Sequence, residues 1–457
     1  MTTSDLHSYM QPGRRIHLIG IGGVSMAALA ETLCSFGLAV AGSDIAESPV
    51  TERLQSLGIP VAIGHRVENI DGTACVIRTA AVREDNPEVQ AARSQGIPIF
   101  ERAQAWGHIM RQYKNAICIA GTHGKTTTTS MTTHILLAAG SDPTVMIGGT
   151  LPKLQAGHRM GGGETIVLES CEYYNSFHNF FPTVAVVLNV EEDHLDYFKD
   201  LDGIKASFRT FADLTPADGC IVANGDDANT MDALAPLERP LLTFGMGEQN
   251  RVRAINITRR DTCTAFDLTL DGALYTRVEL QVPGDHNIKN ALAAAAVGIF
   301  LQFSPEAIHE GLADYTGVGR RFEYKGEYNG AKIYDDYAHH PTELAALLDA
   351  VEPMGFKRII LAFQPHTYTR TNALFDDFVR ELRRPDLALI GEIYAAREQN
   401  TVGVTAQDVA DQISGATHYA TLADMTEVIR TLARPGDIIL TVGAGDIVKV
   451  GEALLFK

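Results

Sequence analysis

The chain has 457 residues, of which 45% are hydrophobic and 21% charged, and its net charge is −18. This length exceeds what one hydrophobic core usually serves, so we expect two to four domains of roughly 100 to 200 residues each. The acidic balance argues against nonspecific binding to nucleic acid or to anionic membranes, because such binding needs a basic face. The six cysteines are scattered without a C-x-x-C pair, which indicates neither a zinc site nor a disulfide framework and fits a reducing cytoplasm. We expect no targeting peptide and no membrane insertion, because the first residues are polar and no run of about 18 apolar residues occurs.

Short β-rich runs alternate with amphipathic stretches along most of the chain, from "RIHLIG" near the start to "DIILTVGAG" near the end. Strands separated by helical patterns of about 10 to 15 residues are typical of parallel sheets in an α/β protein. The less helical stretch 250–283 predicts antiparallel strands. Polar, turn-prone segments at 110–116 and 323–332 are the candidate boundaries, which gives domains 1–113, 114–322 and 323–457.

The stretch "AGTHGKTTTTS", 120–130, follows the buried strand pattern "NAICIA" and opens a helical pattern. The usual phosphate-loop spelling, G-x-x-x-x-G-K-[ST], has glycine where this chain has Ile119. The strand-to-helix context is nevertheless what a phosphate loop needs, because the helix N-terminus faces the anion. Lys125 can then reach the outer phosphates and the Thr126 hydroxyl can ligate Mg²⁺. We favour a nucleotide site over a plain glycine turn with an exposed lysine.

Two acidic stretches follow strands downstream of this loop. Glu169 and Glu172 lie in "TIVLESCEYYNSF", and residues 191–194 lie in "VAVVLNVEEDHLDYF". One acidic run alone would be a solvated strand end. Two runs after strands that follow a G-K-T sequence favour Mg²⁺ ligands.

A glycine turn near the start, "GIGG" at 20–23, follows the first strand, and Asp44 lies about 20 positions further on. This is close to the dinucleotide fingerprint G-x-G-x-x-G, but Ser25 replaces the third glycine. An NAD site, a site for another diphosphate-bearing ligand and a turn without a ligand all remain open.

Four further segments carry polar clusters. In "GDHNIKN" (284–290) and "GVGRRFE" (317–323), helix capping and a solvated basic pair are the simpler interpretations. In "YDDYAHHPTEL" (334–344) and "FQPHTYTRTNALF" (363–375), histidines lie beside acidic or basic residues. Such clusters of titratable groups favour contact with a substrate or nucleotide over structural capping.

Together these stretches resemble the Mur ligase family, the ATP-dependent ligases that build the peptide stem of peptidoglycan. The resemblance runs nearly end to end, through "HLIGIGGVSM", "AGTHGKTTTTSM", "NVEEDHLDYF", "GDHNIKNALAA", "DDYAHHPTE" and "FQPHTYTRT". It implies three domains: an N-terminal Rossmann-like domain for a UDP-sugar, a central P-loop ATPase and a C-terminal Rossmann-like domain for the incoming amino acid. The central domain would combine a mostly parallel sheet with a small antiparallel one.

The resemblance also implies roles for individual residues. The residues expected at the UDP-sugar are Gly20, Gly22, Gly23, Ser43, Asp44 and His65. Those expected at ATP are Gly121, Thr122, His123, Gly124, Lys125, Thr126, Thr127, Asn287, Asn290, Arg321, Asp336 and Tyr337. The implied metal ligands are Thr126, Glu172 and His194. The implied catalytic residues are Lys125, Glu172, His194, His339 and Arg370, with His339 as the base and with His366 and Arg370 near the reacting carboxyl or the amino acid.

The implied reaction joins L-alanine to the carboxylate of UDP-N-acetylmuramate through an acyl phosphate, with ATP as co-substrate and Mg²⁺ as cofactor. A homodimer is a further possibility. The first alternative is a ligase that adds a recycled tripeptide to the same UDP-sugar. The second is an NAD-dependent oxidoreductase or a P-loop switch protein. The chain departs from the family's common E-A-D-E-S-D-x-S-F pattern at Cys171 and Tyr174, where carboxylates are usual, so we expect altered contacts around a retained Glu172.

Overall fold

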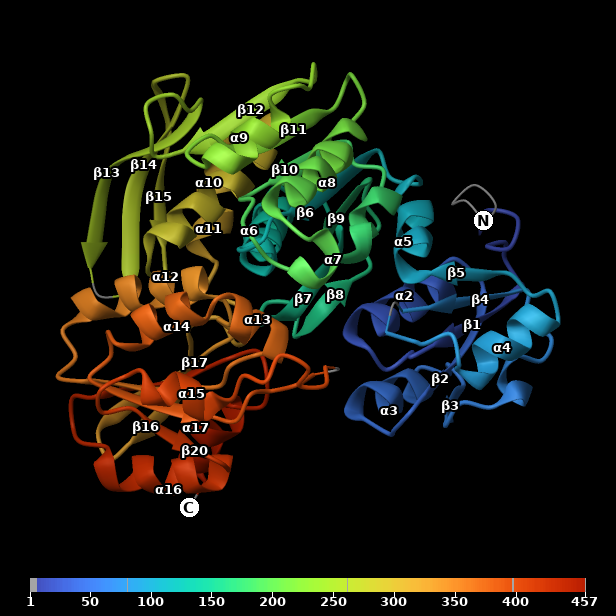
Figure 1. Cartoon of the computed structure of the whole chain (residues 1–457). Helices are drawn as coiled ribbons and strands as arrows, with labels where there is room; N and C mark the ends of the chain where they lie inside the picture. Colours follow the sequence, from blue (N-terminus) through green and yellow to red (C-terminus); the bar gives the residue numbers. More distant parts are fainter. Residues whose placement is uncertain (1–5, 80, 261, 397, 457) are drawn as a thin grey trace. The chain divides into compact units, whose positions relative to one another are not determined.

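The structure is a computed structural model that describes residues 6–79, 81–260, 262–396 and 398–456, without the side chain of residue 196. The chain forms two compact units (Figure 1). The first comprises the described residues up to Val190, Lys205–Phe244 and Ala293–Gly311, and the second comprises Glu191–Ile204, Gly245–Leu292 and the described residues from Leu312 onward. No helix among the described residues is long and apolar enough to cross a membrane.

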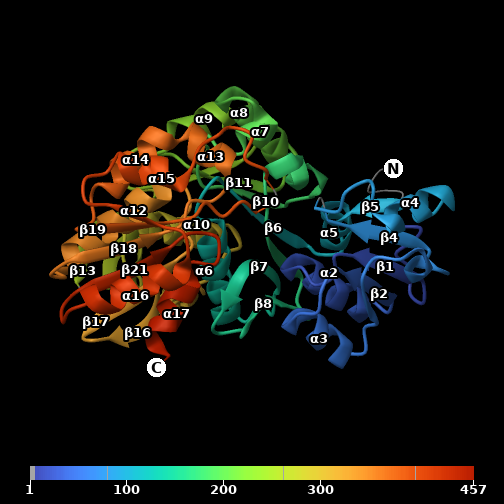
Figure 2. The ribbon, with the colours of Figure 1, turned by 60° about the horizontal axis from the view of Figure 1, so that its bottom comes forward.

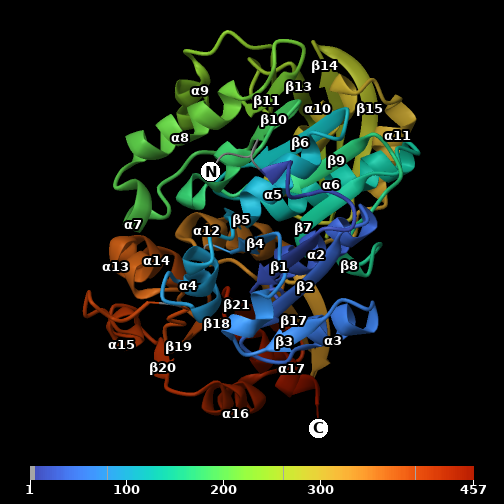
Figure 3. The same cartoon turned by 90° about the vertical axis from the view of Figure 1, so that its right-hand side faces the viewer.

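The N-terminal part of the first unit is a five-stranded parallel sheet with the order β3-β2-β1-β4-β5. Its strands are β1 (Arg15–Ile19), β2 (Ala39–Asp44), β3 (Val61–Ile63), β4 (Cys75–Arg78) and β5 (Ile99–Glu101). Its helices are α2 (Val24–Ser35), α3 (Pro49–Ser56), the 3-10 helix η1 (Val67–Ile70), α4 (Pro87–Ser94) and α5 (Arg102–Met110). Figure 3 shows the strands between α2 and α4, which is the layered arrangement of a Rossmann-like fold.

The central sheet of the first unit has the order β12-β11-β10-β6-β9-β7-β8 and is parallel except for β8. Its strands are β6 (Asn115–Ala120), β7 (Thr144–Leu151), β8 (Ala156–Arg159), β9 (Thr165–Glu169), β10 (Val184–Val187), β11 (Cys220–Asn224) and β12 (Leu241–Gly245). The helical segments of residues 125–313 are α6 (Lys125–Ala138), η2 (Tyr173–Asn179), α7 (Leu195–Phe198), α8 (Leu201–Asp213), α9 (Ala228–Leu234), α10 (Asp285–Phe300) and α11 (Pro305–Ala313). Strand β6 lies inside the sheet between β10 and β9, which explains its continuous apolar sequence.

The predicted antiparallel strands are present in the second unit. They are β13 (Val252–Arg260), β14 (Cys263–Leu270) and β15 (Ala273–Leu280), paired in sequence order. The expectation for 250–283 is therefore confirmed. Their burial alternates along β14, as expected where one face of an antiparallel sheet is packed and the other is exposed.

The C-terminal sheet has six strands in the order β16-β17-β21-β18-β19-β20, and β16 alone is antiparallel to its neighbour. The strands are β16 (Glu323–Tyr328), β17 (Ala331–Asp336), β18 (Ile359–Phe363), β19 (Leu387–Gly391), β20 (Thr417–Tyr419) and β21 (Ile438–Val442). The polar segment 323–332, a candidate boundary, is thus a β-hairpin. Its turn consists of Asn329 and Gly330, whose φ angles of +49° and +73° suit a tight hairpin turn.

Helices cover both faces of this sheet (Figure 2). They are α12 (Pro341–Val351), the 3-10 helix η3 (Glu352–Met354), α13 (Tyr368–Ala373), α14 (Phe375–Leu382), α15 (Ala406–Asp411), α16 (Leu422–Leu432) and α17 (Val448–Leu455). Alternate residues of β18 belong to different cores: Leu361 packs with α12, α14 and α15, while Ile360 packs with α16 and α17. The predicted α/β fold with mostly parallel sheets and Rossmann-like terminal domains is confirmed.

Candidate functional site

The glycine loop lies where the sequence predicts it, between β6 and α6. Ile119 is a buried residue of β6, and Gly121 and Gly124 take up the turn with φ angles of +151° and +83°. A Cβ atom on Gly121 would lie 2.8 Å from the Cβ of Leu188, so glycine is required there for space as well as for conformation. The loop therefore keeps its backbone N–H groups at the start of α6, although glycine is missing at position 119.

Asn189 holds the loop in place from the end of β10. Its side-chain oxygen accepts a hydrogen bond of 2.7 Å from the backbone N–H of His123, and its amide donates to the His123 carbonyl at 3.1 Å. Its backbone carbonyl accepts from Thr122 N–H. Sequence reasoning missed this residue. The available signal was a polar side chain directly after the apolar strand "VAVVL".

Lys125 lies against Glu172, so two of the predicted catalytic residues are in contact. The ammonium donates hydrogen bonds to the carbonyls of Gly121 and Thr122, and its nitrogen is 3.2 Å from Oε2 of Glu172. Burial opposes the charge of Lys125, but the nearby Glu172 carboxylate outweighs burial and raises the pKa of the lysine. The cation is thus fixed in the loop, beside a buried carboxylate.

The remaining residues of this acidic stretch point to different neighbours. Glu169, at the end of β9, accepts a 2.7 Å hydrogen bond from the backbone N–H of Gly148 in β7. Burial and the charge of Glu172 raise the pKa of Cys171 to about 11, so its thiol is neutral near pH 7. Tyr174 is exposed and has a left-handed backbone, with φ of +53°. Glu172 is therefore the member of this stretch that pairs with Lys125.

Thr126 and Thr127 follow Lys125 in the first turn of α6. The Thr126 carbonyl accepts a hydrogen bond from the Ser130 hydroxyl at 2.8 Å, which is ordinary within a helix. Thr127 is buried. The structure thus places both predicted residues at the N-terminus of the helix, next to the lysine.

The predicted UDP-sugar residues meet at the carboxyl end of the N-terminal sheet. Gly20 has φ of +78°, and the backbone N–H of Gly22 donates to Oδ2 of Asp44 at 2.8 Å. A Cβ on Gly22 would lie 2.9 Å from that same oxygen, so the turn and the acidic residue fit closely. Gly23 is the N-cap of α2. In open α/β sheets, ligands bind at this edge of the strands.

Ser43 and His65 lie at the same edge. The Ser43 hydroxyl is 3.1 Å from Nδ1 of His65, which follows β3. Ser43 is fully buried, whereas the His65 side chain is 21% exposed. The structure therefore brings together all six residues expected at the UDP-sugar.

In the second unit, Arg370 forms a nearly buried ion pair with Asp193. Its Nε and Nη2 atoms donate to Oδ1 of Asp193 at 3.2 and 2.8 Å, and its Nη1 is 3.0 Å from Nδ1 of His366. Burial opposes ionisation of Asp193, but the charge of Arg370 holds the pKa of this carboxyl well below its usual range. His194 is next in the chain, with a left-handed backbone at the start of α7 and its Nε2 3.8 Å from Asp193. Burial and Arg370 lower the pKa of His366 to about 4.

A second cluster lies where β17 ends and α12 begins. Nδ1 of His339 is 2.9 Å from the Tyr337 carbonyl and 3.3 Å from Oε2 of Glu343. Arg321 lies over the ring of Tyr337 at 5.2 Å and 3.7 Å from Glu343. The rings of His339 and His366 are 5.6 Å apart, so this cluster adjoins the Arg370 ion pair.

In this second cluster the pKa values of His339 and Asp336 are shifted from their usual values. Burial lowers the pKa of His339 to about 3, although Glu343 acts in the opposite direction, so its imidazole is neutral near pH 7. Burial raises the pKa of Asp336 to about 6, while the carboxylate accepts hydrogen bonds of 2.7 Å from Phe322 N–H and Ala338 N–H. A base with so low a pKa takes a proton from an ammonium group only with difficulty. The role of His339 as the base stays a prediction, and this environment weighs against it.

The predicted adenine residues lie in the first two turns of α10. The Asn287 amide donates to the Pro283 carbonyl at 2.6 Å, and the Asn290 amide is 3.4 Å from the Asn287 oxygen. Both side chains are buried. Arg321 and Glu343 act electrostatically on the neighbouring His286, which places the start of α10 near the second cluster. Neither bond is a helix cap, because both amides donate, whereas a capping side chain accepts from a backbone N–H.

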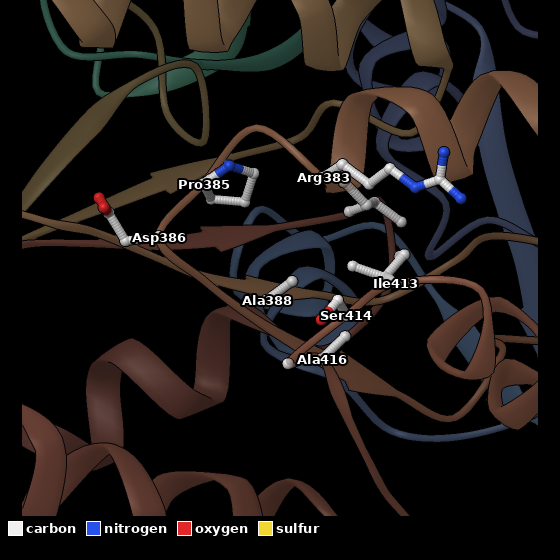
Figure 4. Close-up of a pocket in the computed structure, with 9 residues that line it drawn as sticks. Arg383, Pro385, Asp386, Ala388, Ile413, Ser414 and Ala416 are labelled. Atoms are coloured by element: carbon white, nitrogen blue, oxygen red, sulfur yellow. The ribbon is translucent and has the colours of Figure 1, made fainter.

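A cavity of about 210 Å³ lies elsewhere in the C-terminal domain, between the end of α14, the start of β19 and the loop before β20 (Figure 4). Its two charged side chains already have backbone partners: Arg383 donates to the Gln412 carbonyl and Asp386 accepts from Ile359 N–H. In Figure 4 both side chains point away from Ala388 and Ala416. None of the predicted site residues lines this cavity, and we assign it no function.

Comparisons with known proteins agree with the sequence and the fold. Residues 15–114 match the Mur ligase family catalytic domain, residues 119–298 the Mur ligase middle domain and residues 320–445 the Mur ligase glutamate ligase domain. The UDP-N-acetylmuramate--L-alanine ligase of Caldanaerobacter subterraneus subsp. tengcongensis is 44% identical over 447 residues, or 97% of each chain. The chain belongs to the Mur ligase family. It is therefore an ATP-dependent, amide-forming ligase, and the oxidoreductase and switch-protein alternatives are excluded.

Solved structures of other Mur ligases resemble this ligase along its whole length. The crystal structure of UDP-N-acetylmuramate-alanine ligase MurC from Thermotoga maritima has a TM-score of 0.81 and 29% identity, and the match covers 96% of this chain and 98% of that one. A murein peptide ligase from Psychrobacter arcticus has a TM-score of 0.73 at 23% identity and covers 97% and 98%. At that identity the second likeness shows the fold alone.

Proposed function

We propose that this ligase joins L-alanine to the carboxylate of UDP-N-acetylmuramate, in the cytoplasm, as a step in the synthesis of peptidoglycan precursors. The observation that carries the proposal is the pairing of Lys125 with Glu172 in the glycine loop. Its substrates are suggested by relatives such as the Caldanaerobacter enzyme, whose name states them.

The chemistry requires activation of the sugar carboxylate. A carboxylate is a poor acylating agent, because expelling oxide from a tetrahedral adduct is prohibitive near neutral pH. Transfer of the γ-phosphoryl group of ATP to the carboxylate gives an acyl phosphate, from which the amine of L-alanine displaces phosphate. Phosphoryl transfer depends chiefly on positioning and on neutralising charge over the transferred group. Lys125 supplies such a fixed cation, and the first turn of α6, which begins at Lys125, offers backbone N–H groups to the phosphates, whereas those of Thr122 and His123 donate to Asn189.

Residues of the first unit suit a magnesium ion. Mg²⁺ prefers carboxylate and hydroxyl oxygens, and Glu172 offers a buried carboxylate close to the loop that carries Thr126. When bound, the ion would neutralise charge on the phosphates. We propose Thr126 and Glu172 as metal ligands in the first unit, and His194 as a metal ligand in the second unit.

The remaining predicted residues are assigned to binding of the UDP-sugar, ATP and L-alanine. We propose that the UDP-sugar binds at Gly22, Asp44 and their neighbours in domain 1–113. ATP binds in domain 114–322, with Asn287 and Asn290 near adenine, and also contacts Arg321, Asp336 and Tyr337. L-alanine binds in domain 323–457, where Arg370 and His366 lie beside Asp193.

Phosphate release tests the proposal. With ATP and Mg²⁺, release should require both UDP-N-acetylmuramate and an amino acid, and L-alanine should support it better than glycine, L-serine or a murein tripeptide. Release that needs neither the sugar nor an amine would overturn the ligase assignment, and preference for the tripeptide would replace L-alanine as the acceptor. Lys125→Ala should abolish release while UDP-sugar binding persists. Lys114→Ala, at an exposed lysine before β6, is the matched control and should retain activity.

A further inference from the structure

A buried carboxylate, Glu88, lies beneath the residues proposed to bind the UDP-sugar. It is in the first turn of α4, its side chain is fully buried, and its backbone N–H donates to the Asn86 side chain at 2.9 Å. Burying a carboxylate is unfavourable unless hydrogen bonds compensate for the lost water. The hydrogen-bond partners of Glu88 therefore indicate which residues its negative charge holds in place.

One carboxylate oxygen of Glu88 contacts three side chains near the edge of the sheet. Oε2 accepts a hydrogen bond from the Ser43 hydroxyl at 2.6 Å, and it lies 3.3 Å from Nε2 of His17 and 3.4 Å from Nδ1 of His65. Although burial opposes ionisation, hydrogen bonds with His17, Ser43 and Asn69 lower the pKa of Glu88 to about 2. The carboxylate is thus charged near neutral pH and can only accept hydrogen bonds.

The other oxygen of Glu88 holds the loop that carries His65. Oε1 accepts a hydrogen bond from the Asn69 amide at 2.5 Å and one from the backbone N–H of Arg66 at 3.3 Å. The same Asn69 amide donates to the carbonyl of Gly64 at 3.1 Å. Of the two neighbours of His65, Arg66 is therefore bound to Glu88 directly and Gly64 through Asn69.

These contacts determine which nitrogen of His65 carries hydrogen. The single hydroxyl hydrogen of Ser43 is used on Glu88, so the Ser43 oxygen can only accept from His65. Glu88 can also only accept, so Nδ1 of His65 must be the protonated nitrogen. Among the described residues, no hydrogen bond reaches Nε2 of this partly exposed ring. In the neutral ring, Nε2 is then an acceptor directed away from Glu88.

We propose that Glu88 is a positioning residue for the uridine part of the UDP-sugar. It fixes Ser43 and the tautomer of His65, so that Nε2 of His65 accepts a hydrogen bond from a donor of the nucleotide, either a ribose hydroxyl or the N3–H of uracil. This inference rests on the proposed function, because it takes the UDP-sugar to bind at this edge.

The sign of the effect of Glu88→Gln separates positioning from simple electrostatics. Removing a negative charge near an anionic diphosphate would by itself strengthen binding. The glutamine side chain also carries an NH₂ group in place of one of the two oxygens. Because both oxygens of Glu88 accept hydrogen bonds, this NH₂ group would face donors and the network would break. We expect the KM for UDP-N-acetylmuramate to rise about tenfold, as for the loss of charged hydrogen bonds, while kcat and the KM for ATP stay within about twofold.

Val89→Ala is the matched control, because Val89 is the next residue of α4 and is fully buried in the apolar core. It should lower the melting temperature without changing the KM. An unchanged or lowered KM in Glu88→Gln would overturn the inference, as would an equal rise in Val89→Ala.

A measurement on the wild-type protein does not depend on the variant folding. Long-range proton–nitrogen correlations of ¹⁵N-histidine-labelled protein, assigned with His65→Gln, should show His65 with its hydrogen on Nδ1. The opposite tautomer would overturn the inference. Failure of the proposed function is distinguishable, because the wild-type enzyme would then neither bind nor turn over UDP-N-acetylmuramate.

Discussion

Replacing Asp193 by Asn should destabilise the second unit far more than the same change in an exposed ion pair with equally short contacts. Asp193 and Arg370 are each only 10% exposed, so their charges are largely removed from water. Asn keeps the size of the side chain and one acceptor oxygen but leaves the guanidinium without a counter-charge. The Arg251–Asp271 pair, with two hydrogen bonds of 2.7 Å, is 52% and 54% exposed and provides the comparison.

The expected losses of stability differ because one ion pair is buried and the other is exposed to water. Removing one partner of a buried ion pair costs about 3–5 kcal/mol, and the retained oxygen of Asn places Asp193→Asn near the lower end, at about 3 kcal/mol. Asp271→Asn should cost at most about 1 kcal/mol, because water screens an exposed pair. The pKa of Asp193 is lowered by folding, so its contribution is present above the unfolded pKa of about 3.9 and is lost as the pH falls toward the folded value.

The assay must report on the second unit. The chain has a single tryptophan, Trp106, and it lies in α5 of the first unit, so tryptophan fluorescence would follow the wrong part. Hydrogen exchange of α13 and α14 in increasing urea, read by mass spectrometry, follows the region around Arg370. The difference between wild type and Asp193→Asn should be full at pH 7 and shrink below about pH 4. Equal losses in the two variants, or a difference that does not change with pH, would refute the reasoning.

Three further predictions concern single residues. Gly121→Ala should raise the KM for ATP at least about tenfold, because its Cβ would meet Leu188 at 2.8 Å, whereas Gly140→Ala, also at positive φ but with open space, should not; steady-state kinetics measure both. His340→Ala should lower the unfolding free energy by about 1 kcal/mol, because Nδ1 of His340 caps α12 by accepting from Thr342 N–H, and His340→Asn should recover part of the loss in thermal unfolding. Cys171, with its pKa raised to about 11, should react with iodoacetamide at pH 8 more slowly than the exposed Cys263, and equal rates by mass spectrometry would contradict its neutral, shielded state.

The elements of the site that sequence predicts best are those formed within a short stretch of chain. The strand, the glycine turn and the start of α6 are consecutive, so periodicity and residue type suffice to place Lys125 at a helix N-terminus. The contact between Lys125 and Glu172 joins residues 47 positions apart and depends on β9 lying beside β6. The resemblance to a family supplied a role for each residue but not their contact, which periodicity could not predict either.

Residues that brace the site were missed for the same reason. Asn189 reaches the loop because β10 is the other neighbour of β6, and Glu88 reaches Ser43 from the first turn of α4. In the sequence Asn189 opens the stretch "NVEEDHLDYF", which gave it no role of its own, and Glu88 is a single polar residue without a motif. Arg370 and Asp193, 177 positions apart, meet only through the tertiary fold. The order of strands in a sheet, which periodicity does not encode, is what these predictions lacked.

Cys171 and Tyr174 stand where the family usually has carboxylates, and this affects the negative charge near the glycine loop. A carboxylate at position 171 would stand beside Glu172 and share the field of Lys125, whereas the thiol there is neutral because its pKa is about 11. Tyr174 is exposed, and its left-handed backbone turns the chain after Glu172. In the proposed site, two fewer negative charges would repel the phosphates of ATP less and attract a divalent cation less, since both effects scale with the local charge. Glu172, which forms an ion pair with Lys125, would then be the main carboxylate for a cation in the first unit.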